Sequence, residues 1–221
     1  MIRVALDAMG SDNAPGVEVE GAVKASLRGD VEVILVGNED VLKSRLAAYP
    51  QRGAIQICHA EQVIGMHEQP VMAVREKRQA SIMVAMRLVR DGQADAVVSA
   101  GNTGAVMVAA RTVLGSIRGV ARAAISQALP TATGRVVMLD LGANVDCSAE
   151  HLLQFAVMGS ALVSALDGKE EPSVGLLNIG EEAIKGSEVI KRAGELLREA
   201  GAAGQINFFG NVEGNDIFKG T

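Results

Sequence analysis

Short apolar runs alternate with longer stretches of helical periodicity along the whole chain. The apolar runs predict strands over residues 3–7, 32–36, 54–58, 96–99, 124–128, 136–140, 174–178 and 206–210. The helical stretches predict helices over residues 17–27, 39–48, 70–90, 104–114, 150–166 and 186–199. Such alternation is typical of βαβ units and a mostly parallel sheet, so the sequence predicts an α/β fold.

The same pattern gives little reason to divide the chain into domains. The polar segment 167–172 (DGKEEP) is the candidate for a surface loop between subdomains. We therefore predict a single α/β domain over residues 1–221, with any subdomain boundary near 167–172.

Polar, glycine-rich segments follow five of the predicted strands. They cover residues 7–15, 99–104, 140–146, 178–182 and 210–214. The carboxyl ends of parallel strands share one edge of a sheet, and open α/β folds bind ligands there. The five segments therefore predict a ligand site on that edge. The alternative is that strand-to-helix turns need Gly, Asn and Asp for positive φ and for helix caps.

Residues 99–104 (SAGNTG) join a predicted strand to a predicted helix. Free N–H groups at a helix N-terminus bind anions, and the helix dipole favours negative charge. Asn102 and Thr103 add side-chain donors, so the junction suits phosphate or an acyl phosphate; a plain helix cap is the alternative. No lysine follows Gly104 and no G-x-G-x-x-G occurs, which disfavours a nucleoside triphosphatase or a dinucleotide dehydrogenase.

Charged residues fall near the same edge. Asp7 and Asp140 end apolar strands and suit a divalent metal, general-base catalysis or the orientation of loop backbone. A phosphate beside them needs compensating cations, for which Lys77, Arg78 and Lys185 are candidates. The basic segment 75–81 (REKRQAS) suits phosphate or an acidic carrier, or is a solvated helix face.

The cysteines and histidines offer one further hypothesis. Cys147 and His151 lie four residues apart at a predicted helix start and suit a nucleophile pair, although a small buried cysteine is the commoner case. Cys58, His59 and His67 lack metal-ligand spacing, so we predict no metal site. Two cysteines are too few for a disulfide framework, which indicates a reducing compartment.

The bulk composition narrows the class of protein. The chain is 48% hydrophobic and 2% aromatic, and its formal net charge is −5. An aliphatic core is therefore expected, and a general nucleic-acid binder is disfavoured. The N-terminal sequence MIRVALDAMG lacks the long apolar region of a signal peptide, and no run of about 18 apolar residues occurs. We predict a soluble cytoplasmic protein.

Seven segments together resemble the phosphate acyltransferase family of bacterial phospholipid synthesis. They are DAMGSDNAP (7–15), LVGNED (35–40), SAGNTGAVM (99–107), DLGANVDC (140–147), QFAVMGS (154–160), GLLNIGEEAIKG (175–186) and NFFGNVEGNDIFKG (207–220). Their order and spacing match the family through the whole chain.

The resemblance implies a three-layer α/β/α sandwich related to phosphotransacetylases and isopropylmalate dehydrogenases. It implies a homodimer that transfers a fatty acyl group reversibly from acyl carrier protein to inorganic phosphate. No cofactor is expected, since a phosphate dianion is already a nucleophile. The acyl phosphate then feeds a membrane enzyme, so peripheral association with the inner face of the plasma membrane is expected beside the cytoplasmic location.

The resemblance and the loop pattern together assign candidate residues. The catalytic candidates are Asp7, Lys77, Ser81, Asn144 and Lys185. The candidates for binding phosphate or acyl phosphate are Ser99, Gly101, Asn102, Thr103, Gly104, Asp140, Gly142, Asn178 and Glu181.

Three positions depart from the family pattern. The chain ends at Thr221, whereas family members continue with another strand, a glycine-rich loop and more helices, which puts the activity of this chain in question. Ser11 stands where a second glycine is usual, so one backbone position loses freedom. Ala80–Ser81 stands where a pair of serines is usual, so one hydroxyl is missing.

We expect direct attack of phosphate on the acyl thioester. Phosphate would sit against the SAGNTG helix start, and donors from the loops after Asp140 and Asn178 would hold the developing oxyanion. A covalent acyl group on Cys147 is the alternative route. Two other functions stay open: a metal- and NAD-dependent dehydrogenase of the same fold, and a non-catalytic protein that binds phosphate or carrier protein.

Overall fold

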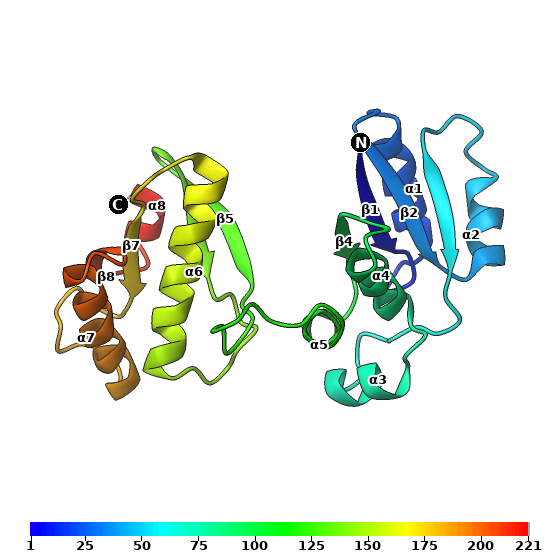
Figure 1. The fold of residues 1–221 in the computed structure, drawn as a ribbon. Helices are drawn as coiled ribbons and strands as arrows, with labels where there is room; N and C mark the ends of the chain where they lie inside the picture. Colours follow the sequence, from blue (N-terminus) through cyan, green and yellow to red (C-terminus); the bar gives the residue numbers. More distant parts are fainter. Residues whose placement is uncertain (221) are drawn as a thin grey trace. The chain divides into compact units, whose positions relative to one another are not determined.

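The computed structural model describes residues 1–220 and divides the chain into two compact units (Figure 1). The first unit runs from Met1 to Ile117, and the second begins at Arg118. We expected a boundary, if any, near 167–172, but that segment lies inside the second unit. The chain instead changes unit in a stretch without helix or strand, where Gly115 and Gly119 take positive φ angles of 83° and 90°. Glycine adopts that backbone conformation without steric cost.

The first unit is built on a four-stranded parallel sheet. Its strands are β1 (Ile2–Asp7), β2 (Val31–Gly37), β3 (Ile55–His59) and β4 (Ala96–Ser99), in the order β3-β2-β1-β4. Its helices are α1 (Gly16–Ser26), α2 (Glu39–Leu46), α3 (Pro70–Glu76), α4 (Ser81–Arg90) and α5 (Thr103–Val113). Each strand is followed by a helical connection, as the alternating pattern predicted.

Helices cover both faces of this sheet. On one face, Val19 and Val23 of α1 and Leu42 of α2 pack on Leu35 of β2. On the other face, Ala85 of α4 packs in a separate buried cluster that includes strand residues of β1 and β2. Burying a Val or Leu side chain contributes about 1.5–3 kcal/mol, so two apolar clusters hold three layers together. The predicted α/β/α sandwich with a mostly parallel sheet is confirmed.

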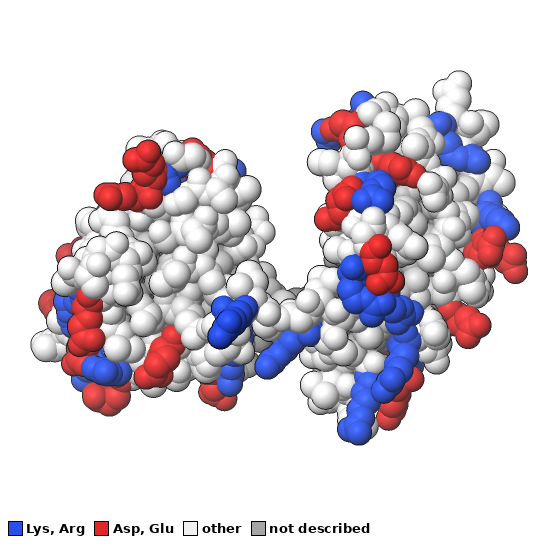
Figure 2. Space-filling model, in the orientation of Figure 1, with Lys and Arg blue, Asp and Glu red and all other residues white. Residues whose placement is uncertain are grey.

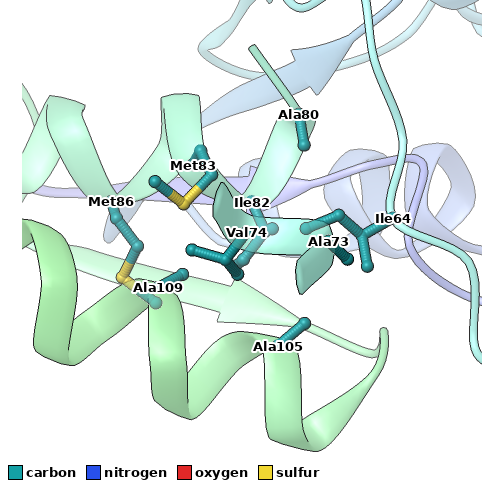
Figure 3. Close-up of a cluster of buried hydrophobic side chains, with 9 residues drawn as sticks. All are labelled: Ile64, Ala73, Val74, Ala80, Ile82, Met83, Met86, Ala105 and Ala109. Atoms are coloured by element: carbon teal, nitrogen blue, oxygen red, sulfur yellow. The ribbon is translucent and has the colours of Figure 1, made fainter. Parts of the chain in front are cut away.

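A third apolar cluster joins α3, α4 and α5 (Figure 3). Val74 of α3, Met83 and Met86 of α4, and Ala105 and Ala109 of α5 are all buried in it. The small alanines let α5 approach closely, and the flexible methionines fill the remaining space. This cluster fixes where α5 begins.

The predicted helix over 70–90 is two helices. Lys77 ends α3 with φ −100° and ψ 65°, outside the helical region, and α4 begins at Ser81. Between them, Ala80 forms a parallel bridge with Gln62, and the Ser81 N–H donates to the Gln62 carbonyl. Pairing with this distant segment therefore interrupts a stretch whose local periodicity is helical throughout.

The second unit contains two small sheets. Strands β5 (Ser126–Thr131) and β6 (Gly134–Leu139) form an antiparallel hairpin, whereas β7 (Ser173–Leu177) and β8 (Asn207–Val212) are parallel. Its helices are α6 (Ala149–Asp167), α7 (Glu188–Ala202) and α8 (Asp216–Lys219). The hairpin departs from the predicted alternation, because the turn between β5 and β6 is too short to hold a helix.

Helices α6 and α7 pack on the β7–β8 pair. The buried cluster contains Leu176 of β7, Ala193 and Leu197 of α7, and Ala149 of α6. By length and composition alone, α6 would be able to cross a membrane, with a mean hydropathy of 1.3. Core helices of soluble proteins pass the same test, so this is weak support for a membrane span.

Candidate functional site

The first unit contains a topological switch point between β1 and β4. From β1 the chain continues to β2 and β3 on one side, and β4 then pairs with β1 on the other side. The loops after β1 and β4 therefore leave the sheet in different directions from neighbouring strands. Open α/β sheets bind ligands at such points, at the carboxyl ends of the strands.

A buried carboxylate holds the two loops together. Asp7 ends β1, is 2% exposed, and lies opposite Ser99, the last residue of β4. The Ser99 hydroxyl donates to the Asp7 Oδ2 at 2.8 Å and accepts the Gly101 N–H at 3.1 Å. The other oxygen of Asp7 accepts the Met9 N–H at 3.3 Å. Both predicted candidates thus meet here, and their side chains orient the backbone of the loops.

Two glycines allow the loops to touch. A Cβ on Gly10 would lie 2.6 Å from the Asp7 Oδ2 and 3.1 Å from the Gly101 Cα. A Cβ on Gly101 would lie 3.2 Å from both the Cα and the carbonyl oxygen of Gly10. The first distance is shorter than a normal contact, so any larger residue at position 10 would require the Asp7 carboxylate or the loop backbone to shift.

Asn102 caps α5 and also holds a neighbouring segment. Its Oδ1 accepts the Ala105 N–H at 3.1 Å, which is a regular N-cap bond. Its Nδ2 donates to the carbonyls of Gly65, Met66 and Glu68 at 3.3, 3.1 and 3.0 Å. We expected this amide to bind phosphate, but both of its ends are already engaged. Asn102 therefore has a positioning role in this structure.

Lys77 is engaged in the same segment. Its ammonium group donates to the Val63 carbonyl at 2.9 Å and pairs with the Glu68 carboxylate at 2.6 Å. Glu68 also accepts the Gly65 N–H at 2.6 Å, and the bonds from Lys77 and Gly65 lower the pKa of Glu68. We expected Lys77 to offset phosphate charge, but its charge is balanced here by Glu68.

Ser81 lies away from solvent. It is 1% exposed at the start of α4, beneath the bridge between Gln62 and Ala80. The expected contact between its hydroxyl and phosphate stays a prediction. Its burial follows from the apolar cluster around α4, in which the flanking Ile82 and Met83 are also buried.

The start of α5 leaves backbone donors open. Thr103 and Gly104 are the first two residues of the helix, and their N–H groups have no acceptor within residues 1–220. Thr103 is exposed, so this point is open to solvent. A Cβ on Gly104 would lie 2.6 Å from the Pro70 Cγ, so the start of α3 is close beside it. The arrangement suits an anion that takes its hydrogen bonds from the backbone.

A basic surface lies over α3 and α4 of the first unit (Figure 2). The Arg87 guanidinium donates to the Arg78 carbonyl at 2.7 Å and to the Gln79 Oε1 at 2.9 Å. These partners carry no charge, and no carboxylate within residues 1–220 lies within hydrogen-bond distance of Arg87 to balance its positive charge. The predicted basic cluster is therefore present on the surface and extends onto α4.

In the second unit, Asp140 organises the loop after β6. Its carboxylate accepts the N–H groups of Ile125 and Asn144, both at 2.8 Å, and the Asn144 Nδ2 at 3.0 Å. Burial raises the pKa of Asp140, but the bonds from Ile125 and Asn144 outweigh it and lower the pKa below its ordinary value. The Asn144 amide also donates to the Ala123 carbonyl at 2.9 Å. Gly142 provides the turn, with φ 79°.

The loop after β7 forms a second polar cluster. Asn178 accepts the Ile179 N–H at 2.8 Å and donates to the Lys185 carbonyl at 3.1 Å, which closes the loop on itself. The side chains of Glu181 and Lys185 are exposed, and neither forms an ion pair within residues 1–220. Lys185 is therefore a lysine candidate whose charge remains available.

Cys147 and His151 do not form a nucleophile pair. The His151 Nδ1 accepts the Ser148 N–H at 3.0 Å, and the Ser148 hydroxyl accepts the His151 N–H at 3.4 Å. These two bonds form a capping box at the start of α6, so the imidazole stabilises the helix N-terminus. Burial and the nearby Asp140 charge raise the pKa of the Cys147 thiol. The thiolate that a covalent route needs is thus disfavoured.

No group of three or more His, Cys, Asp or Glu side chains suited to a metal ion occurs in the part of the chain that the structure describes. The two strand-end carboxylates instead accept hydrogen bonds from the loops. Asp7 accepts from Ser99 and Met9, and Asp140 accepts from Ile125 and Asn144.

The sequence comparisons assign the chain to a family. The family model described as "Fatty acid synthesis protein" matches residues 2–221. The chain belongs to this family. Relatives named "Phosphate acyltransferase" include proteins of Polaromonas sp. strain JS666 and Delftia acidovorans, each 56% identical to this chain. The match covers 100% of this chain in both cases, but 61% and 63% of the relatives, so the chain spans about three-fifths of their length.

Solved structures show the fold of this member of the fatty acid synthesis protein family. A EutD phosphotransacetylase from Staphylococcus aureus is similar with a TM-score of 0.67 at 19% identity, over 96% of this chain and 68% of that chain. A 4-hydroxythreonine-4-phosphate dehydrogenase from Burkholderia phymatum is similar with a TM-score of 0.56 at 18% identity, over 96% and 74%. The predicted relation to phosphotransacetylases is confirmed at the level of fold.

Two residues that shape the site in this family member were not among the sequence candidates. Gly10 stands in the first glycine-rich loop, so the loop pattern pointed to its neighbourhood but not to its contact with Gly101. Glu68 gives no sequence signal, because its partners Gly65 and Lys77 are brought to it by the turn into α3.

Proposed function

We propose that this protein transfers a fatty acyl group from acyl carrier protein to inorganic phosphate and so forms an acyl phosphate. The observation that carries the proposal is the open start of α5. The N–H groups of Thr103 and Gly104 have no acceptor within residues 1–220, and they lie at the β1–β4 switch point. The name of the relatives, "Phosphate acyltransferase", at 56% identity along this whole chain, supports the same reaction here.

Phosphate would bind through backbone rather than through a lysine. The N–H groups of Thr103 and Gly104 would donate to its oxygens, and the positive end of the α5 dipole would favour its charge. Asp7 and Ser99 would keep the loop in place from below. The Ser11 hydroxyl is buried without a partner within residues 1–220, so it is a candidate for an additional donor in the loop that touches Gly101.

The proposed reaction is a direct acyl transfer. A phosphate oxygen attacks the carbonyl carbon of the thioester, the new C–O bond forms, and the C–S bond breaks. The sulfur leaves on the carrier as a thiolate and takes a proton from water. The phosphate dianion is itself a nucleophile, so the chemistry requires positioning and charge stabilisation more than a protein nucleophile.

The second unit also carries candidate site residues. Lys185 stays a candidate catalytic residue, since its own charge is not balanced by an ion pair within residues 1–220. Asp140 and Asn144 would fix the loop around Gly142, and all three stay candidate site residues. Asn178 would hold the loop that carries Glu181 and Lys185.

The partner and setting follow from the same proposal. Acyl carrier protein is acidic, so the basic surface around Arg78 and Arg87 would attract it. We also propose a homodimer that works in the cytoplasm and associates peripherally with the inner face of the plasma membrane, where its product would be used.

The reaction is tested with palmitoyl-acyl carrier protein and inorganic phosphate. We expect phosphate-dependent release of the free carrier thiol together with an acyl phosphate that hydroxylamine traps. Omission of phosphate is the control. Thiol release that is independent of phosphate, or a stable acyl group on Cys147 found by mass spectrometry, would contradict the proposal.

The phosphate site is tested by Thr103→Pro. Proline is favoured at the first position of a helix, and Asn102 has the φ −55° and ψ 108° that a residue before proline accepts, so the fold is expected to remain. The variant lacks one proposed N–H donor, and we expect at least about tenfold weaker phosphate binding. Thr103→Ala keeps the N–H and is the matched control.

Binding is followed by the amide NMR shifts of Gly104 and Ala105 during titration with inorganic phosphate, so the result does not depend on turnover. Equal affinity of Thr103→Pro and the original chain would place the phosphate elsewhere. Sulfate, titrated in parallel, measures how far the site discriminates among anions.

A further inference from the structure

An ion pair holds the segment in front of α3. Glu68 and Lys77 lie on either side of that helix, and the Lys77 Nζ meets the Glu68 Oε1 at 2.6 Å. The same carboxylate oxygen accepts the Gly65 N–H at 2.6 Å, and the same ammonium group donates to the Val63 carbonyl at 2.9 Å. The two charges therefore fix the backbone at residues 63–65 as well as each other.

This pair differs from an ion pair on a helix surface. Lys24 and Glu20 of α1 also pair, at 2.5 Å, but their side chains are 74% and 49% exposed, whereas those of Lys77 and Glu68 are 32% and 35% exposed. Exposed pairs contribute little to stability, because water and salt screen the two charges. A partly buried pair that is also bonded to backbone constrains the chain around it more firmly.

The fixed segment supplies the acceptors of Asn102. The Asn102 Nδ2 donates to the carbonyls of Gly65, Met66 and Glu68 at 3.3, 3.1 and 3.0 Å. The Oδ1 of the same side chain accepts the Ala105 N–H of α5 at 3.1 Å. Asn102 is thus bonded to the segment at one end of its amide and to the helix at the other, so a shift of the segment would move the start of the helix.

A second contact joins the same parts of the unit. Pro70 opens α3 two residues after Glu68, and a Cβ on Gly104 would lie 2.6 Å from the Pro70 Cγ. A shift of the 63–68 segment would therefore reach Gly104 from this side as well. Thr103 and Gly104 carry the N–H groups proposed to bind phosphate, and a hydrogen bond weakens steeply when its donor is misaligned.

We propose that Glu68 and Lys77 are positioning residues of the phosphate site, and that their ion pair directs the N–H groups at the start of α5 through Asn102. The inference rests on the proposed function, because it needs phosphate at that helix start. It assigns an unexpected effect to Glu68. A carboxylate near an anion site repels the anion, yet removal of this one is expected to weaken phosphate binding.

Charge and positioning predict different results for substitution of the pair. If charge alone mattered, Glu68→Gln would free the Lys77 cation and strengthen phosphate binding, whereas Lys77→Met would weaken it. With a positioning role, each substitution weakens phosphate binding about fivefold or more, because the donors of α5 lose their alignment. The double variant is expected to bind no more weakly than either single variant, since each change already breaks the same ion pair.

The experiment is a titration with inorganic phosphate, followed by the amide NMR shifts of Gly104 and Ala105. The side-chain amide signals of Asn102, recorded without phosphate, report on its bonds to the 65–68 segment, and we expect Glu68→Gln and Lys77→Met to move them. Lys77→Arg keeps a cation with several donors, so its phosphate affinity is expected to stay within about twofold of the original.

The pair on α1 provides matched controls. Glu20→Gln and Lys24→Met also break a Lys–Glu ion pair of the first unit, but this pair lies on another helix and does not hold the 63–68 segment. We expect both control variants to bind phosphate as the original chain does. The melting temperature of every variant, followed by circular dichroism, shows that it is folded at the temperature of the titration.

Four results would overturn the inference. Tighter phosphate binding by Glu68→Gln would make Lys77 a direct ligand of phosphate. A lower melting temperature with unchanged phosphate affinity would make the pair purely structural. Unmoved Asn102 signals in both variants would break the connection to α5. Absence of a saturable shift in the original chain would refute the proposed phosphate site itself, and the inference with it.

Discussion

Replacement of Asn102 by alanine tests whether the start of α5 depends on one amide. The cap bond to Ala105 contributes about 1 kcal/mol to stability. The amide has two protons for three carbonyls of the 65–68 segment, so the donated bonds add about 1–2 kcal/mol more. We therefore expect Asn102→Ala to lower the free energy of unfolding of the first unit by about 2–3 kcal/mol.

Asn38 provides the matched control, because it is also an asparagine N-cap. It caps α2 through a single bond, from the Val41 N–H to its Oδ1 at 3.1 Å. Asn38→Ala is expected to cost only the cap, about 1 kcal/mol. Urea unfolding followed by circular dichroism gives the two free energies. The difference between the two variants isolates the contribution of the bonds to the 65–68 segment.

Asn102→Asp separates the two roles within one residue. The carboxylate keeps the cap acceptor and favours the helix dipole, but it has no N–H for the carbonyls. We expect α5 to keep its slow amide exchange while the 65–68 segment exchanges faster. We also expect phosphate binding to fall, because a negative charge stands at the proposed anion site. Equal unfolding free energies for Asn102→Ala and Asn38→Ala would refute the reasoning.

Two further predictions concern the first unit. Gly10→Ala places a Cβ 2.6 Å from the Asp7 Oδ2, so we expect the free energy of unfolding to fall by about 1–3 kcal/mol and phosphate binding to weaken. Gly16→Ala is the control, because a Cβ there has nothing within 4 Å. In the same urea assay we expect it to be neutral or stabilising. Side-chain and backbone bonds from Arg3 lower the pKa of Asp95 from 3.8 to about 2. Because the folded-state pKa is the lower one, the pair stabilises the fold above about pH 4 and loses that effect as the pH falls through about 2. The stability difference between the original chain and Asp95→Asn should shrink over that range, and a difference independent of pH would contradict the assignment.

The fold of the first unit was largely predictable because its elements follow local patterns. Buried parallel strands appear as short apolar runs, and β4 begins and ends where the pattern placed it, at Ala96 and Ser99. The prediction of one helix over residues 70–90 was wrong because of a non-local contact. The bridge between Gln62 and Ala80 interrupts a helix that the local periodicity alone would continue. The β5–β6 hairpin was missed as such because a hairpin strand and a βαβ strand have the same short apolar pattern.

The sequence predicted where the candidate site lies better than it predicted what each side chain does there. The glycine-rich loops after β1 and β4 do meet, and Asp7 and Ser99 do contact each other across the sheet. The roles assigned to Asn102 and Lys77 followed from their chemistry alone, since each is a good phosphate donor. Which partner they choose depends on the 63–68 segment, whose position is set by contacts that no spacing in the sequence reveals.

The engagement of Asn102 and Lys77 within the protein has one physical cause, and it bears on how the proposed phosphate site works. A lysine or amide that is held by the protein loses its freedom to serve a ligand, but it fixes the backbone around it. Asn102 fixes the start of α5, and Lys77 with Glu68 fixes the segment that Asn102 holds. The groups left open are the N–H donors of Thr103 and Gly104, which every residue except proline carries. A site made of backbone donors can be recognised in the sequence only from the residues that position the backbone. In this protein, mutations of Asn102 and Lys77 therefore test the support of the proposed anion site and not its direct ligands.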